Sequence, residues 1–526
     1  MYDLLIRNGK IVDGTGNPWY LADIAIKNGK IVKIARNLEG ASVTIDAGGK
    51  IVSPGFIDAH THSDFTLLAD PQALSKVHQG VTTEVVGNCG GWLAPILGQA
   101  IETVKQQVAR YGGLEVDWTS TAGYLAKIES RKSAVNVVPL VGFGSVRASV
   151  MGYAERPATP EERRKMRDLV EQNVDEGAFG MSTGLFYAPQ SFAPTDEVID
   201  VAKGLKPKEA LYVSHIRDES DYTIGMGAAL EEAYKIAREA GVPLHISHLH
   251  ALGIATWGKA AEYVQSIEEA RESGLDATGD QYPYAACGGG ITGSVMPRWA
   301  LAGGRTELLK RLGDKQTRDK IAKEVATNFE RRGGAWRHRF SIYKPNPEFE
   351  GMTLDKVAEI LGEPPEYAVL TMLEKGDASW VSQIIDEDDI ETFMKAPWVM
   401  GGSDGSALAL EGAVAGGKPH PRNFGTFPRM VGVYARDKRL FPVHEIVRKI
   451  TSLPAQRFGL SDRGVLKEGF CADITVFCPN TIRDTSTFDN PHQLAEGVEY
   501  TIVNGEIVVH NGKHTGRLPG HALRRR

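Results

Sequence analysis

Eight apolar runs, each closed by polar residues, constrain the fold of this chain more than any other feature. They span residues 55–62, 81–89, 135–144, 178–185, 210–217, 242–250, 275–284 and 398–404. Stretches with helical periodicity lie between most of them, at residues 160–176, 196–205, 224–240, 259–273 and 388–395. Uniformly apolar strands that alternate with helices are typical of parallel sheets. Eight such units predict an α/β fold of the (β/α)8 barrel type, also called a TIM barrel.

The two ends of the chain have a different pattern, made of short strands and turns. The motif NGKIV occurs at residues 8–12 and 28–32, and the similar motif NGEIV occurs at residues 504–508. Asn-Gly pairs between apolar strands are hairpin signals, so we expect turns at Asn8-Gly9 and Asn28-Gly29. We therefore predict one small β-sandwich domain from residues 1–54 plus 465–526, beside a barrel of residues 55–464.

A long segment separates the last two apolar runs. Residues from about 288 to 350 begin with three glycines and continue with a charged, helix-like stretch. This length predicts an insertion into the barrel. Two placements fit the sequence equally well: over the mouth of the barrel, or packed on its outside.

Charge and cysteine usage exclude several classes of protein. The chain has 60 basic and 66 acidic residues, a net charge of −6 and a pI near 6.2, so no basic footprint for nucleic acid is present. No apolar stretch is long enough to span a membrane, and the first residues lack the layout of a signal peptide. The four cysteines have no framework spacing, which favours a reduced cytoplasm. We expect a small-molecule partner, and a homo-oligomer remains open.

Potential metal ligands end five of the eight runs. In a parallel barrel the active site lies at the carboxyl ends of the strands. A lone His-x-His is weak support for a metal site, but donors at four further strand ends argue against purely structural histidines. Zinc prefers such nitrogen, sulfur and oxygen donors. The candidates are His60, His62, Cys89, His215, His248 and Asp404.

Longer stretches of the sequence resemble a known family. The stretches GFIDAHTHSD, GVTTEVVGNCG, GMSTGLFYAP, HISHLHALG and HPRNFGTFPR resemble the amidohydrolase superfamily, and within it the D-aminoacylase (N-acyl-D-amino-acid deacylase) family. These stretches span nearly the whole chain.

The resemblance implies two metal positions. It implies a zinc ion held tightly by Cys89, His215 and His248. It also implies a second, weaker position at His60, His62 and Asp404.

One departure separates the chain from other amidohydrolases. Many members of the superfamily bridge two metals with a carboxylated lysine on the fourth strand, but residues 178–183 contain no lysine. Cys89 would take that place. This argues against dihydroorotase and hydantoinase chemistry.

The expected reaction is zinc-dependent removal of the acyl group from an N-acyl amino acid, with D configuration implied by the resemblance. Zinc lowers the pKa of a bound water to about 7, and Asp404 can act as general base and then general acid. Two alternatives remain: hydrolysis of a cyclic or peptide-like amide, and a non-catalytic amidohydrolase-like scaffold.

Substrate contacts are predicted from the loops after the strands. Tyr187 is placed to donate to a developing oxyanion, or is a packed aromatic residue. Arg422 can clamp a carboxylate, joined by Tyr282. His250 shares the face of His248 and stands where the family commonly has lysine. Arg217, with Arg147, is a candidate replacement for that missing cation.

Overall fold

Parallel strands close into a barrel in the computed structural model, which describes residues 1–111 and 114–525. One sheet has the order β17-β13-β12-β11-β10-β9, and another has the order β6-β7-β8. The two sheets join because β9 continues β8 after Leu140, and because Thr61 and Gly405 form a parallel bridge beside β6 and β17. The strands are β6 (Phe56–Asp58), β7 (Val81–Val86), β8 (Asn136–Pro139), β9 (Val141–Gly142), β10 (Gly180–Gly184), β11 (Leu211–His215), β12 (Leu244–Ile246), β13 (Ala277–Gln281) and β17 (Val399–Gly401). Every one lies inside a predicted apolar run, so the predicted barrel is confirmed.

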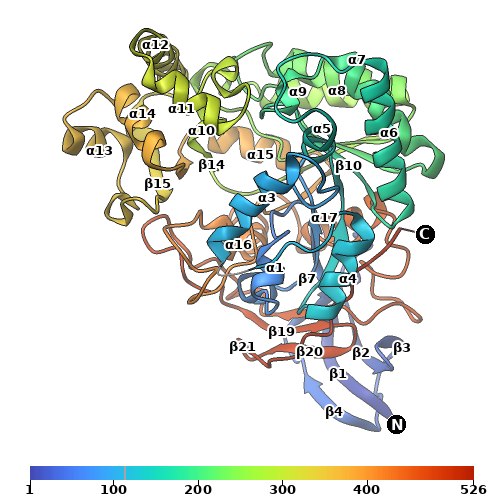
Figure 1. Cartoon of the computed structure of the whole chain (residues 1–526). Coiled ribbons are helices and arrows are strands. Elements are labelled where there is room, and N and C mark those ends of the chain that lie inside the picture. The colour runs from blue at the N-terminus through green and yellow to red at the C-terminus, as the bar shows by residue number, and fades with distance from the viewer. Residues whose placement is uncertain (112–113, 526) are drawn as a thin grey trace.

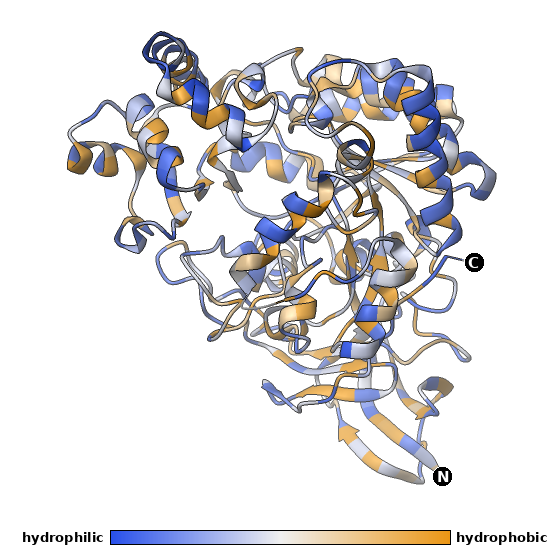
Figure 2. Cartoon of the chain, viewed as in Figure 1, coloured by the Kyte–Doolittle hydropathy of each residue, from blue (hydrophilic) through white to orange (hydrophobic). Residues whose placement is uncertain are grey.

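Helices that connect the barrel strands, or follow the last of them, surround the barrel (Figure 1). Their bounds are α4 (Thr121–Arg131), α5 (Phe143–Met151), α6 (Pro160–Asp175), α7 (Thr195–Ala202), α8 (Met226–Ala240), α9 (Ala260–Glu272), α15 (Glu387–Lys395), α16 (Arg422–Arg429), α17 (Val443–Lys449) and α18 (Ser452–Arg457). Helix α6 begins with a capping box between Thr159 and Glu162, and buries Met166 and Val170. Its other residues are mostly hydrophilic, as Figure 2 shows. Among the described residues, no helix combines the length and the apolar character needed to cross a bilayer.

Strands from both ends of the chain form one sheet beside the barrel. The path runs β21-β20-β19-β18-β5-β1-β2-β3, with β4 paired to β1. In Figure 1 the red C-terminal strands lie beside the blue N-terminal strands. The link between the two ends is the antiparallel pair of β5 and β18. The bounds are β1 (Tyr2–Ile11), β2 (Tyr20–Lys27), β3 (Lys30–Ala35), β4 (Ala41–Asp46), β5 (Ile51–Pro54), β18 (Ile474–Phe477), β19 (Val498–Val503), β20 (Glu506–His510) and β21 (Lys513–His514).

The prediction of a hairpin turn at Asn8-Gly9 is wrong. Strand β1 continues through this pair, and its register against β2 shifts between Ile6 and Gly9, which marks a β-bulge. Asn8 has a φ of 58°, the left-handed conformation that bulges and turns share. The expected turn at Asn28-Gly29 does connect β2 to β3.

The segment between β13 and β17 carries its own small sheet and core. The sheet has the order β14-β16-β15, and a separate apolar cluster lies under it. We call residues 287–382 the inserted segment; they extend beyond the predicted residues 288–350. The elements are β14 (Cys287–Gly290), α10 (Ile291–Ser294), α11 (Arg305–Gly313), α12 (Lys315–Arg331), β15 (His338–Ile342), α13 (Leu354–Leu361), α14 (Pro365–Lys375) and β16 (Ser379–Ser382). Residues of this segment line the cavity at the carboxyl ends of the barrel strands.

Candidate metal centre

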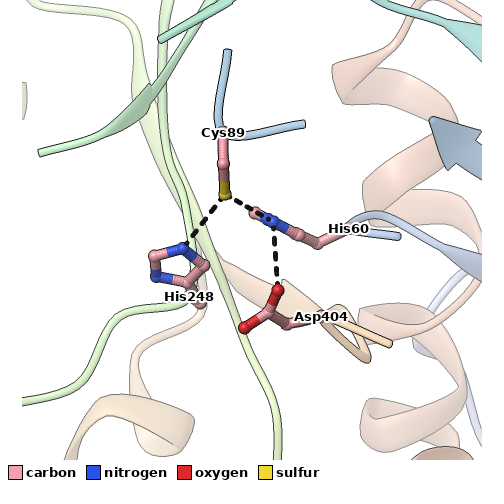
Figure 3. A group of neighbouring side chains, drawn as sticks. All are labelled: His60, Cys89, His248 and Asp404. Atoms are coloured by element: carbon pink, nitrogen blue, oxygen red, sulfur yellow. Dashed lines mark hydrogen bonds and ion pairs between the residues drawn. The ribbon is translucent and has the colours of Figure 1, made fainter. Parts of the chain in front are cut away.

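Four of the predicted ligands converge on one point at the carboxyl ends of the strands (Figure 3). The Sγ atom of Cys89 lies 3.3 Å from Nε2 of His60 and 3.4 Å from Nε2 of His248. Nε2 of His60 lies 3.6 Å from Oδ1 of Asp404. The donor atoms come from the ends of four different strands, so the barrel itself sets their spacing.

A second group adjoins the first and shares His248 with it. His215, Glu219 and His248 offer ligand atoms within 4.8 Å of one another. Neither ring nitrogen of His215 has a hydrogen-bond partner, although its side chain is buried. Buried polar groups without partners are uncommon and call for an explanation. A bound cation would explain them here.

His62 and Asp404 form the outer edge of the cluster. Nε2 of His62 lies 2.9 Å from Oδ1 of Asp404, and the guanidinium of Arg422 lies 2.7 Å from Oδ2 of the same carboxylate. Burial raises the pKa of Asp404, but the charge of Arg422 and the hydrogen bond from His62 hold it well below its usual value. The carboxylate is therefore ionised and faces the other donors.

The charges of Cys89 and the neighbouring histidines also shift one another's pKa values. Burial raises the pKa of the Cys89 thiol, but the charges of His60 and His248 outweigh it and hold the pKa well below the usual value. Burial lowers the pKa of His60, but Asp280 and Cys89 together raise it to about 9. A buried set of acidic and basic donors with such coupled charges suits a metal ion, which replaces the protons.

Three of the cluster residues adopt left-handed backbone conformations. Cys89 has a φ of 54°, His248 of 31° and Asp404 of 49°. Residues other than glycine pay for this conformation, at a cost of about 1–3 kcal/mol each, and such strain concentrates at functional sites. In each case the turn directly follows a strand and aims the side chain into the cavity.

Two acidic residues that sequence reasoning missed hold the histidines in place. Oδ2 of Asp280 lies 3.2 Å from Nδ1 of His60 and 2.8 Å from Nε2 of His245, and Oδ1 accepts the backbone N–H of His248. Glu219 Oε1 lies 2.9 Å from Nδ1 of His248. Carboxylates in this position orient metal-binding imidazoles. A carboxylate near a strand end is a natural partner for a ligand histidine, but the sequence spacing does not say which histidine it supports.

The predicted substrate contacts are brought into one cavity of about 640 Å³. Tyr187, His250, Tyr282 and Arg422 all line it. The ring of Tyr187 lies 4.8 Å from that of His215, and the ring of Tyr282 lies 5.2 Å from that of His250. The hydroxyl of Tyr282 is buried and has no hydrogen-bond partner.

Arg217 is not brought into the site. Its guanidinium forms two hydrogen bonds of 2.8 Å with Glu232 on α8 and reaches two backbone carbonyls. Arg147 is likewise fully buried against Glu197. Neither lines the cavity, so the geometry does not support the prediction of replacement cations. Each arginine instead forms an ion pair with a carboxylate on a neighbouring helix.

Nitrogen, sulfur and oxygen donors at the carboxyl ends of barrel strands are the arrangement expected of a metal-dependent amidohydrolase. Residues 43–509 match the amidohydrolase family, and the chain belongs to this family. It is 37% identical over 525 residues to D-aminoacylase of Alcaligenes xylosoxydans xylosoxydans, covering 100% of this chain and 98% of that protein. Within the family it groups with the D-aminoacylases, as the sequence predicted.

Two solved structures extend this comparison. A D-aminoacylase described as having a binuclear metal centre has a TM-score of 0.85 and 33% identity, with 100% of both chains covered. N-acyl-D-glutamate deacylase from Bordetella bronchiseptica, complexed with zinc and a phosphonate inhibitor, has a TM-score of 0.84 and 31% identity, again over 100% of both chains.

Proposed function

We propose that this protein is a zinc-dependent deacylase of N-acyl-D-amino acids. One observation carries the proposal: Cys89, His60, His248 and Asp404 converge at the edge of the cavity, beside His215, whose buried ring nitrogens make no hydrogen bond. The D configuration is supported by the names of the relatives, D-aminoacylase and N-acyl-D-glutamate deacylase.

The donor set fits zinc. Thiolate, imidazole and carboxylate are its usual ligands in proteins. We assign the tighter position to Cys89, His215 and His248, and a second position to His60, His62 and Asp404. Zinc held there would lower the pKa of a coordinated water to about 7 and polarise the amide carbonyl.

The chain's own residues supply proton transfer and orientation. Oδ1 of Asp404 faces His60 and His62, and is placed to accept the proton of the attacking water and to deliver it to the leaving nitrogen. Arg422 lies over the ring of Tyr282, with 4.8 Å between its central carbon and the ring centre. These two side chains form the candidate contact for the α-carboxylate. Tyr187, beside His215, is the candidate donor to the oxyanion.

The four cysteines are all free thiols. A thiol in the metal centre must stay reduced to bind metal. We therefore also propose a reducing compartment, with the cytoplasm as the natural candidate.

The test combines metal analysis with paired substrates. Purified protein should contain zinc and should hydrolyse N-acetyl-D-amino acids faster than their L enantiomers. Cys89→Ala should lose tightly bound zinc and activity together, whereas Cys478→Ala, which changes a thiol of the β-sheet domain, should keep both. Hydrolysis of hydantoin or dihydroorotate in place of acyl amino acids would establish the cyclic-amide alternative. Stoichiometric zinc without hydrolysis of any amide would establish the other alternative, a non-catalytic amidohydrolase-like scaffold.

A further inference from the structure

Three buried polar residues support the turn that carries Asp404, from outside the substrate cavity. Lys76 on α2 (Leu74–Val77), Asp58 on β6 and Ser403 after β17 are fully buried, and none of the three lines the cavity. The Lys76 ammonium lies 2.8 Å from Oδ2 of Asp58 and 2.7 Å from Oγ of Ser403. We call Lys76, Asp58 and Ser403 the buried triad. Any effect of the triad on catalysis is therefore exerted through other residues.

The triad holds this turn at the residues on both sides of Asp404. The backbone N–H of Ser403 donates to Oδ1 of Asp58 at 2.8 Å, and the backbone N–H of Gly405 donates to the Ser403 hydroxyl at 3.0 Å. The N–H of Asp404 itself donates to the carbonyl of His60. Asp404 has a φ of 49°, and a left-handed backbone at a residue other than glycine persists only where its surroundings enforce it. The triad supplies a large part of that enforcement.

The same triad also reaches the end of the first barrel strand. Oδ1 of Asp58 lies 3.4 Å from the backbone nitrogen of His60. The Ser403 hydroxyl lies 3.4 Å from the carbonyl oxygen of the same residue. These contacts hold the ends of β6 and β17 against each other. The separation between the His60 ring and the Asp404 carboxylate therefore depends on the triad.

The other two left-handed turns of the metal centre have polar anchors of their own. In the turn after β7, the backbone N–H of Gly90 donates to the buried hydroxyl of Ser182 at 2.9 Å. In the turn after β12, the backbone N–H of His248 donates to Oδ1 of Asp280 at 2.9 Å. Each turn that aims a candidate ligand is thus held by a buried polar side chain. The triad is the corresponding anchor for Asp404.

Stability alone does not account for a buried lysine and aspartate at this place. Taking two charges out of water is unfavourable, and apolar residues of similar volume in place of a buried ion pair are often neutral or stabilising. The pair of Lys76 and Asp58 is therefore not explained by the free energy of unfolding. A buried ion pair can instead specify one conformation, and the conformation that this pair contacts is the Asp404 turn.

We propose that the buried triad is a set of positioning residues that aim the Asp404 carboxylate for proton transfer and for metal binding at the second position. The proposal rests on the proposed function for the role of Asp404 and adds the residues that set its geometry. A displacement of about 1 Å in a reacting group can lower a rate about 10²-fold. Arg422, the candidate contact for the substrate carboxylate, donates its backbone N–H to His420, outside the triad. Loss of the triad should therefore lower kcat more than it changes KM.

The first test removes the hydroxyl of the triad from the full-length protein, loaded with one equivalent of zinc to fill the tighter position. We expect Ser403→Ala to lower kcat for an N-acetyl-D-amino acid by about 10–100-fold and to change KM by less than about twofold. Ser53→Ala is the matched control and should keep the wild-type kcat. The Ser53 hydroxyl is equally buried, but it contacts the carbonyls of Pro54 and Thr475 in the β-sheet domain. A rise in KM with unchanged kcat in Ser403→Ala would overturn the proposal.

A double variant separates positioning from stability. Lys76→Met combined with Asp58→Asn removes both charges of the ion pair and keeps an oxygen for the N–H of Ser403, so neither charge is left unpaired. Its urea midpoint should stay close to that of the wild type, whereas its kcat should fall. Wild-type kcat in this variant would overturn the proposal.

Zinc binding gives a readout that does not depend on hydrolysis. Equilibrium dialysis should show the second equivalent of zinc bound about 10–100-fold more weakly by Ser403→Ala and the first bound as in the wild type, because Asp404 is assigned only to the second position. Unchanged kcat and zinc affinity in Ser403→Ala, or equal losses in Ser53→Ala, would overturn the proposal. A weakened second zinc in protein that hydrolyses no acyl amino acid would support the triad and refute the proposed function. Hydrolysis that Ser403→Ala leaves at the wild-type rate would do the reverse.

Discussion

Asp280 offers the sharpest test of how the barrel holds its metal. It supports two ligand residues at once: the ring of His60 through Oδ2, and the backbone N–H of His248 through Oδ1. In Asp280→Asn the oxygen that accepts from His248 can remain. The other position becomes an amide N–H₂ group, which cannot accept a hydrogen bond from either His60 or His245.

The size of the effect follows from this count of contacts. Loss of one outer partner of a ligand histidine lowers metal affinity by about 10–100-fold, or about 1.4–2.8 kcal/mol. Asp280→Asn should therefore weaken metal binding at the second position, which His60 helps to form, by that factor. Asp280→Ala also removes the support of His248 and should weaken the tighter zinc position as well.

Competition with a chelator of known zinc affinity measures the effect in each variant. Asp389→Asn is the control, because Asp389 is also buried but accepts only from Gly258 and Ala260 at the start of α9. Unchanged zinc affinity in Asp280→Asn, or an equal loss in Asp389→Asn, would refute the reasoning.

Three further predictions concern stability and metal dependence. Lys76→Met should lower the free energy of unfolding in urea by about 3–5 kcal/mol, because Asp58, 2.8 Å from the Lys76 ammonium, is left buried without its cation. The same change at the exposed Lys203 should cost little. Equal urea midpoints for the two variants would contradict this reasoning. Burial raises the pKa of Glu84 from 4.5 to about 7, so between these values the folded state keeps a proton that the unfolded state has released, and stability should fall as pH rises. Glu84→Gln should remove that slope, and an identical pH profile would exclude Glu84 as its source. Chelation should abolish hydrolysis and added zinc should restore it, whereas full activity of metal-free protein would contradict a metal-dependent mechanism.

The barrel was predictable because strands buried on both faces appear in the sequence as continuous apolar runs. The error at Asn8-Gly9 has a physical reason. An Asn-Gly pair signals a left-handed backbone, and both hairpin turns and β-bulges use that conformation. Only the pairing of β1 with β4 and β5, which lie later in the chain, decides between the two.

The candidate site was predictable where residue type and strand end coincide. Cys89, His215 and Asp404 could be named because each closes an apolar run. The supporting carboxylate of Asp280 could not be assigned from spacing, since its partner His60 lies 220 residues away. Arg217 was misplaced for a different reason. Its partner Glu232 is only 15 residues away, but it belongs to α8, and the sequence does not specify how that helix is oriented.

The sheet built from both chain ends has a consequence for synthesis on the ribosome. Strand β5 pairs on one edge with β1, but its other edge waits for β18, and the paired residues Pro54 and Ile474 are separated by 420 positions. At the usual rate of about 5–20 residues per second, that edge stays open for roughly 20–80 s while the barrel emerges. Unpaired strand edges invite association with other chains. The nascent protein therefore has a defined interval in which chaperone protection of its first strands matters most.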